Sequence, residues 1–201
     1  MALRRRQGQR QVKTTILIVG EGKKTEPIYF DGLKREEAVS RAFAVTVKKG
    51  PGYSAEAVVK AAIDLRRGGI FDQVWCVIDV EGPAHAASLK AAMDLAAQEG
   101  ITLCLSNPAF EVWLLAHFER RAGLFKDCDA VITDLSKHWQ KAFGTDYEKN
   151  DQRIYEKLET RTNDAIANAQ TVYEKEHTGK SRTDRNSSSE VYQLVKRLLG
   201  R

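Results

Sequence analysis

The chain has 201 residues, 42% of them hydrophobic and 29% charged, a composition typical of a globular protein in water. This length fits one domain, or one domain with an appended helical piece, and is enough for a hydrophobic core. No apolar run approaches the roughly 20 residues of a membrane span, and the basic segment 1–13 lacks the apolar core of a secretory signal. We therefore expect a cytoplasmic protein with no membrane contact.

The net charge is +5 and the sequence pI is near 9.1. Much of the excess positive charge lies near the two ends, at Arg4, Arg5, Arg6, Arg10, Lys180, Arg182 and Arg185. Such basic patches suit nucleic-acid phosphates. A solvated tail and a solvated loop explain each patch about equally well.

The first half of the chain alternates between strand and helix patterns. In chain order, the predicted elements are a strand at 15–19, a helix at 26–38, a strand at 42–48, a helix after Ser54, a strand at 74–78, a helix at 84–98 and a strand at 101–105. Repeated strand-helix units predict an α/β, Rossmann-like fold: a four-stranded, mainly parallel sheet flanked by helices.

After Asn107-Pro108 the composition changes and no further strand is predicted. Helical patterns cover residues 109–119, 128–142, 150–176 and 188–199. The segment from His177 to Ser189 is rich in Gly, Ser, Lys and Arg, which predicts a mobile loop. The expected organisation is a basic flexible N-terminus at 1–13, an α/β core at 14–122 and a helical extension at 123–201 packed on that core.

Acidic residues follow two of the predicted strands. Glu21 comes directly after the first strand, and Asp79 ends the third, with Glu81 two residues further on. Working residues of parallel sheets lie at the carboxyl ends of the strands, so these three side chains are expected to converge. If the backbone stays extended through Val80, Asp79 and Glu81 share one face and Val80 packs inward.

Three converging carboxylates raise one another's pKa values unless a cation neutralises them. Oxygen ligands without a nearby Cys or His pair favour Mg²⁺ or Mn²⁺ over zinc. Lys23 and Lys24, beside Glu21, can neutralise phosphate oxygens. A divalent ion and an acid/base carboxylate together commonly catalyse hydrolysis or transfer at a phosphodiester. The three cysteines are widely separated and indicate neither a zinc site nor disulfides.

Spacing excludes two familiar glycine motifs around Gly20-Glu21-Gly22. Lys24 stands where a Walker loop needs Ser or Thr, and Leu17 stands where it needs its first glycine. Thr25 occupies the third glycine position of a dinucleotide-binding fingerprint. Neither nucleotide-binding loop is indicated.

The pattern strand-Glu-Gly-Lys followed by strand-Asp-x-acid resembles the Toprim domain of topoisomerases, primases and small nucleases. Four blocks in order are similar to the RloB-like family, found beside restriction and abortive-infection genes in bacteria: GEGKKTEPIYF, VWCVIDVEG, SNPAFEVWLLAHF and NSSSEVYQLVKRL. The resemblance covers residues 14–199. It implies a Toprim-like core, with Glu21 as the acid/base carboxylate and Asp79 and Glu81 as metal ligands.

By this resemblance the chain is a metal-dependent nuclease acting on DNA or RNA in phage defence, often with an ATPase partner. The family's Asp-Arg-Asp block reads Asp79-Val80-Glu81 here, so a possible arginine contact to phosphate is lost. That departure favours the alternative, a non-catalytic nucleic-acid-binding or regulatory subunit of an ATPase-containing complex. Phosphoryl or nucleotidyl transfer to a small molecule is a third possibility, which a deep closed pocket would favour.

Several further residues have both a functional and a structural interpretation. Glu26, His85, Asn107 and Glu111 can support the site, while helix-terminus, surface or core roles compete with that interpretation. Packing is the simpler role for His117, and the core for the aromatic residues Tyr53, Trp139 and Tyr192, which can also stack on bases. Phosphate binding and simple solvation are balanced for Lys180, Arg182 and Arg185.

Overall fold

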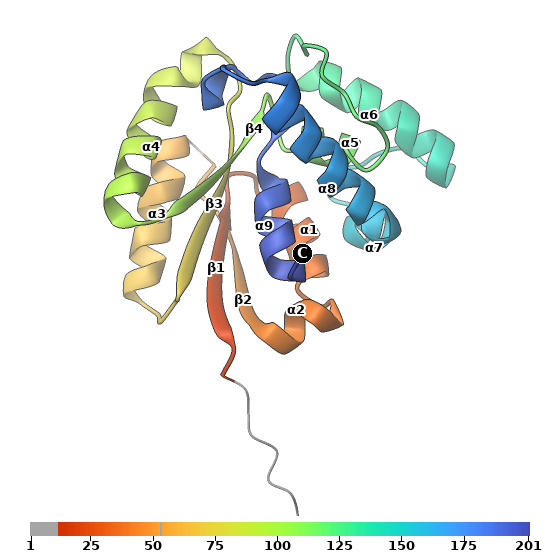
Figure 1. Cartoon of the computed structure of the whole chain (residues 1–201). Helices are drawn as coiled ribbons and strands as arrows, with labels where there is room; N and C mark the ends of the chain where they lie inside the picture. Colours follow the sequence, from red (N-terminus) through yellow and green to blue (C-terminus); the bar gives the residue numbers. More distant parts are fainter. Residues whose placement is uncertain (1–11, 53) are drawn as a thin grey trace, which may run out of the picture.

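The computed structural model describes residues 12–52 and 54–201, and its centre is one sheet covered by helices on both faces (Figure 1). The strands are β1 (Thr14–Gly20), β2 (Phe43–Lys49), β3 (Gln73–Asp79), β4 (Thr102–Asn107) and β5 (Ser188–Ser189). They lie in the order β2-β1-β3-β4-β5. The first four are parallel, and β5 is antiparallel to β4. The predicted mixed α/β fold is confirmed.

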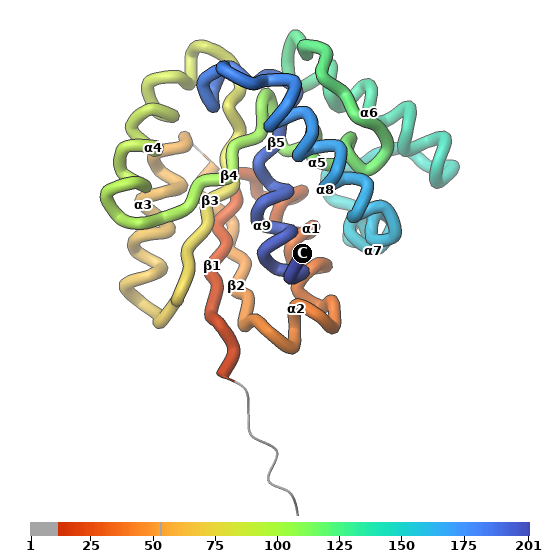
Figure 2. Tube along the Cα trace, viewed as in Figure 1, coloured from red at the N-terminus to blue at the C-terminus, as the bar shows by residue number. Residues whose placement is uncertain are grey.

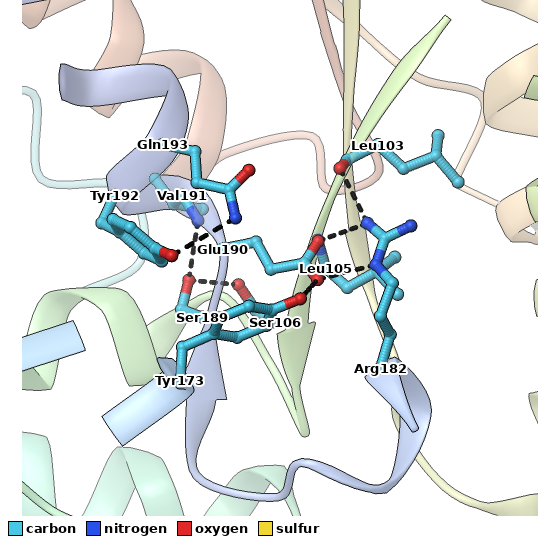
Figure 3. Close-up of polar contacts among 10 residues, drawn as sticks. All are labelled: Leu103, Leu105, Ser106, Tyr173, Arg182, Ser189, Glu190, Val191, Tyr192 and Gln193. Atoms are coloured by element: carbon cyan, nitrogen blue, oxygen red, sulfur yellow. Dashed lines mark hydrogen bonds and ion pairs between the residues drawn. The ribbon is translucent and has the colours of Figure 1, made fainter. Parts of the chain in front are cut away.

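The fifth strand was not predicted from the sequence. It pairs Ser188 with Asn107 and Ser189 with Ser106, and the hydroxyls of Ser106 and Ser189 lie 2.8 Å apart in a hydrogen bond (Figure 3). Two serines carry no strand pattern of their own. This strand exists because a distant part of the chain returns to the edge of β4.

The helices form two layers. They are α1 (Thr25–Leu33), α2 (Glu37–Ala42), α3 (Ala55–Arg67), α4 (Ala86–Glu99), α5 (Glu111–Leu115), α6 (Cys128–Phe143), α7 (Ile154–Leu158), α8 (Thr162–Thr171) and α9 (Val191–Leu199). Helices α3 and α4 cover one face of the sheet, while α1 and α9 lie on the other (Figures 1 and 2). The alternation of β1 divides its side chains between these layers: Ile16 and Ile18 pack with α1, and Leu17 and Val19 pack with α3.

Two predicted helices are divided in the structure. The helix expected at 26–38 ends at Leu33 and restarts at Glu37, because Glu36 has an extended backbone with ψ of 136°. The long helix expected at 150–176 becomes α7, a 3₁₀ turn at Glu159–Arg161, α8, and a π-helical turn at Val172–Glu176. The breaks let α7 pack on α1 and α8 pack on α5 and α9, which one straight helix does not allow.

The segment between His177 and Ser189, which was predicted to be a mobile loop, makes specific contacts with the rest of the protein. Its centre is tied to β4 through Glu190, whose side chain is 2% exposed. The Glu190 carboxylate accepts hydrogen bonds from the Leu105 amide at 3.0 Å, the Tyr173 hydroxyl at 2.6 Å and the Arg182 Nε at 2.8 Å (Figure 3). Arg182 also pairs with it through Nη2. A buried carboxylate needs such partners, and they fix the segment.

The structure leaves part of the predicted N-terminal segment undescribed. Arg4, Arg5, Arg6, Arg10 and Tyr53 lie outside the described residues. Within residues 12–52 and 54–201, no helix is both long enough and apolar enough to cross a membrane.

Candidate active site

The carboxyl ends of β1 and β3 meet at one edge of the sheet and bring Glu21 to Asp79. The two strands are paired in register, with Gly20 opposite Val77. The Glu21 amide donates to the Val77 carbonyl at 2.9 Å, which extends the pairing by one residue. The Glu21 side chain turns back, and its Oε2 accepts the Asp79 amide at 3.1 Å. Parallel pairing of two strands that end in acids therefore creates the site.

A pocket of about 490 Å³ lies at this edge. Its lining includes the five acids Glu21, Glu26, Asp79, Glu81 and Glu111, and the basic residues Lys23, Lys24, Lys149 and His85. The predicted catalytic acids, three of the four predicted supporting residues and both predicted phosphate-binding lysines of the first loop thus line one cavity. A lining that combines carboxylates and cations suits a ligand that carries both a metal ion and a phosphate.

Asp79 is the least satisfied acid of the pocket. Its Oδ1 is buried and has no hydrogen-bond partner within the described part of the chain. Burial raises the pKa of Asp79 well above its ordinary value, and the charges of Glu26, Glu111, Glu21 and Glu81 raise it further. An uncompensated oxygen among like charges is costly, which is the usual signature of a site that takes a ligand or a proton.

The pKa of Glu21 is also raised, mainly by burial. The hydrogen bond from the Asp79 amide opposes that shift, while the charges of Glu81 and Glu26 add to it. A carboxyl whose pKa lies above the ordinary range exchanges protons more readily near neutral pH. Glu21 therefore has the electrostatics expected of an acid/base group.

Glu26 belongs to the pocket and does more than interact with the dipole of α1. It is 4% exposed, and its Oε1 accepts the Gly22 amide at 2.7 Å. Burial raises the pKa of Glu26, and the charge of Glu111 adds to the shift. A Cβ atom on Gly22 would lie 2.3 Å from the Glu26 Oε2, so glycine allows the loop to approach the carboxylate where it now lies.

Two residues from the segment after α6 contact the pocket acid Glu111, and one of them, Lys149, also lines the pocket. Glu111, 3% exposed, accepts the Tyr147 hydroxyl at 3.2 Å and pairs with the Lys149 Nζ at 3.1 Å. Burial alone would lower the pKa of Lys149, but Glu111 and Asp79 outweigh it and the pKa is raised. Sequence analysis missed Tyr147 and Lys149, because their segment carries no motif and only the tertiary fold brings it here.

Glu81 reaches the pocket by a different path from the one predicted. The extended backbone ends at Asp79, and Glu81 has a φ of 50°, so the expected alternation along one strand does not apply. Val80 packs inward as predicted, with 8% exposure. The Glu81 amide donates to the Pro108 carbonyl at 2.9 Å, and its carboxylate pairs with the His85 Nε2 at 2.8 Å. A turn rather than strand geometry places this acid.

Other proposed residues lie elsewhere. Asn107 donates to the Thr183 carbonyl at 2.6 Å and lines a second cavity. His117 lies 3.0 Å from the Trp113 carbonyl, and burial lowers its pKa to about 4, which fits the packing role. Trp139 and Tyr192 lie in the core.

The basic residues of the segment before α9 contact the protein itself. Lys180 lies 3.1 Å from the His177 Nδ1, and Arg185 donates to the Tyr173 carbonyl and stacks 4.2 Å from its ring. Arg182 holds Glu190. None of the three lines the acidic pocket. Their binding to a nucleic-acid backbone stays a prediction.

The acids of the pocket are not arranged as a ready-made metal centre. Across residues 12–52 and 54–201, no three His, Cys, Asp or Glu side chains are grouped closely enough to ligate an ion as they stand. Two of the five acids already have side-chain partners, Glu81 with His85 and Glu111 with Lys149. Cation binding at Asp79 and Glu21 therefore requires side-chain adjustment.

Comparison with protein families gives one match. A family model described as RloB-like protein matches residues 16–198, which is nearly the whole chain and includes every residue of the pocket. A search of curated proteins found no match.

Proposed function

This chain belongs to the RloB-like protein family, and from that premise we propose that it is a metal-dependent nuclease acting in bacterial phage defence. It hydrolyses phosphodiester bonds of DNA or RNA. The observation that carries the proposal is the crowding of four other carboxylates around Asp79, whose Oδ1 has no partner among the described residues, with three lysines lining the same cavity.

The donor set fits a hard divalent cation. Every acid in the pocket offers oxygen, and the one histidine is paired with Glu81. Mg²⁺ and Mn²⁺ prefer such oxygen ligands. Asp79 and Glu81 would hold the ion, with Glu21 beside it, and the ion would polarise a phosphoryl oxygen and neutralise developing charge. Binding would also relieve the repulsion that raises the pKa of Asp79.

The protein's own groups orient the phosphate and move the proton. Lys23, Lys24 and Lys149 supply positive charge that attracts the phosphate group into the acidic pocket. Glu21 accepts a proton from a water molecule while the oxygen of that water molecule forms a bond to phosphorus. The bond from phosphorus to a sugar oxygen breaks, and that oxygen takes a proton from solvent. The raised pKa of Glu21 favours this proton transfer near neutral pH.

The direct test is cleavage of labelled single-stranded and duplex DNA and RNA with Mg²⁺ or Mn²⁺. Wild-type protein and a Glu37→Gln control, altered on the exposed helix α2, should cleave alike. Asp79→Asn and Glu21→Gln should both lose activity. Equal cleavage by wild type and both pocket variants would identify a contaminant and refute the assignment.

A second candidate is a non-catalytic nucleic-acid-binding or regulatory subunit of an ATPase-containing defence complex. The contacts Glu81–His85 and Glu111–Lys149, which occupy two of the acids, favour it. This candidate predicts nucleic-acid binding without cleavage of any substrate, with or without divalent ions. The same assay therefore separates the two.

A further inference from the structure

A second cavity lies next to the acidic pocket and has a different character. Its volume is about 790 Å³, inside the roughly 300–1,000 Å³ range of small-molecule sites. Glu81 lines both cavities, so they adjoin at this residue. A polymer whose phosphate lies in the acidic pocket can continue directly into the second cavity.

The wall of this cavity combines an apolar surface with polar groups. Val80, Pro83, Leu89 and Met93 supply apolar surface from the turn after β3 and from α4. The lining also includes Asn107 and residues of the segment before α9, Ser181, Arg182 and Thr183, together with the charged residues Lys90, Asp94 and Asp184. An apolar surface combined with polar groups can accommodate a planar base attached to a sugar phosphate.

Arg182 gives the cavity a positioned cation. Its Nε and Nη2 bind Glu190, and Nη2 also donates to the Leu103 carbonyl at 3.0 Å. Nη1 makes no hydrogen bond with any described residue, and Figure 3 shows it directed away from both partners. The guanidinium is therefore fixed on one edge and available on the other. Holding it in place in advance reduces the entropy lost when it binds a phosphate.

We propose that this second cavity is a nucleotide subsite, which holds the nucleotide next to the cleaved phosphodiester in a single-stranded nucleic acid. The base lies against Leu89 and Met93, and the Nη1 of Arg182 binds its phosphate. The inference rests on the proposed nuclease function and adds a substrate preference to it. A duplex, whose bases are paired and stacked, presents no free base to this cavity.

The test fills the cavity without touching Arg182 or the acids. Ala86 lines it, while the neighbouring Ala87 does not, and both are exposed at the start of α4. Ala86→Trp and Ala87→Trp thus form a matched pair. Each is made together with Asp79→Asn, so that binding is measured without cleavage. The probe is a fluorescent single-stranded oligonucleotide of roughly 12 nucleotides, the DNA and RNA forms separately, measured by anisotropy.

The subsite predicts that Ala86→Trp weakens binding about tenfold, near the loss of one stacked base, while Ala87→Trp leaves it unchanged. Thermal denaturation confirms that both variants are folded. Unchanged binding by folded Ala86→Trp would overturn the subsite and leave the nuclease proposal standing. If the protein without either tryptophan binds neither oligonucleotide, the subsite and the proposed function both fail, and the cleavage assay then also shows no activity.

Discussion

Two acids with buried carboxylate oxygens, Glu190 and Asp79, have opposite surroundings. Glu190, 2% exposed, has its oxygens satisfied by Arg182, Tyr173 and the Leu105 amide. Asp79 has an oxygen with no partner in the described chain, and the charges of four neighbouring acids add to the rise of its pKa that burial causes. Glu190 fastens the C-terminal extension to β4. The difference teaches that burial of an acid alone does not point to a functional site, whereas an uncompensated buried oxygen makes Asp79 the better candidate.

The largest expected effect on stability comes from removing the ion pair between Arg182 and Glu190. Arg182→Ala leaves Glu190 buried without its cation and should lower the free energy of unfolding by about 3 kcal/mol, because an unpaired buried charge is strongly destabilising. Urea unfolding measures it. The matched control is Arg41→Ala, which removes an exposed ion pair with Glu37 and should cost no more than about 1 kcal/mol. Equal costs would mean that the Glu190 pair is not structural.

Asp79→Asn should show the reverse pattern, with activity lost and stability kept. Cleavage should fall at least about 100-fold, the scale of losing one electrostatic partner of a transition state. Stability without divalent ions should equal or exceed that of wild type, because the substitution removes one charge from a crowded set. Parallel kinetics and thermal denaturation measure both. If Asp79→Asn lost much of its stability, Asp79 would be a structural acid, as Glu190 is, and the account would be contradicted.

Because the pKa of Asp79 is raised, the difference in stability between Asp79→Asn and wild type should depend on pH. A carboxyl whose pKa is higher in the folded than in the unfolded state favours folding while protonated, so stability falls as pH rises from about 4 through the raised pKa. The advantage of Asp79→Asn over wild type should therefore increase between pH 4 and pH 8 in a chelator. Thermal denaturation at a series of pH values measures the difference. If the stability difference between Asp79→Asn and wild type stayed constant over this pH range, the raised pKa of Asp79 would be contradicted.

The smallest expected effect tests the close approach of Gly22 to Glu26. Gly22→Ala places a methyl group where the Glu26 carboxylate lies, so the acid must move, and cleavage should fall about tenfold, or roughly 1.4 kcal/mol of activation free energy. Gly68→Ala is the control, because a Cβ there meets nothing closer than 3.6 Å. Indistinguishable rates would show that the position of Glu26 is unimportant for catalysis.

Periodicity and strand ends were sufficient to predict the parallel sheet and the meeting of Glu21 with Asp79. Both depend on local pattern and on the rule that parallel strands end at one edge. The turn that carries Glu81 was not predictable, because its φ of 50° comes from tertiary contacts such as the bond to the Pro108 carbonyl. Lys149 was missed for a similar reason, since nothing in its local sequence indicates contact with Glu111.

The composition of the segment before α9 was misleading. Gly, Ser, Lys and Arg predict a solvated loop, but Arg182 is drawn inward by Glu190, a residue eight positions later that the serine run separates from it. Long-range satisfaction of one buried acid thus outweighs local composition.

The most direct test of the central claim is calorimetric titration of Mn²⁺ into metal-free protein. If the crowded acids form a cation site, wild type and Glu37→Gln should bind with a saturable heat, and Asp79→Asn should bind at least about tenfold more weakly. Equal binding by all three proteins would contradict the account, because the cation would then be held somewhere other than the pocket of Asp79.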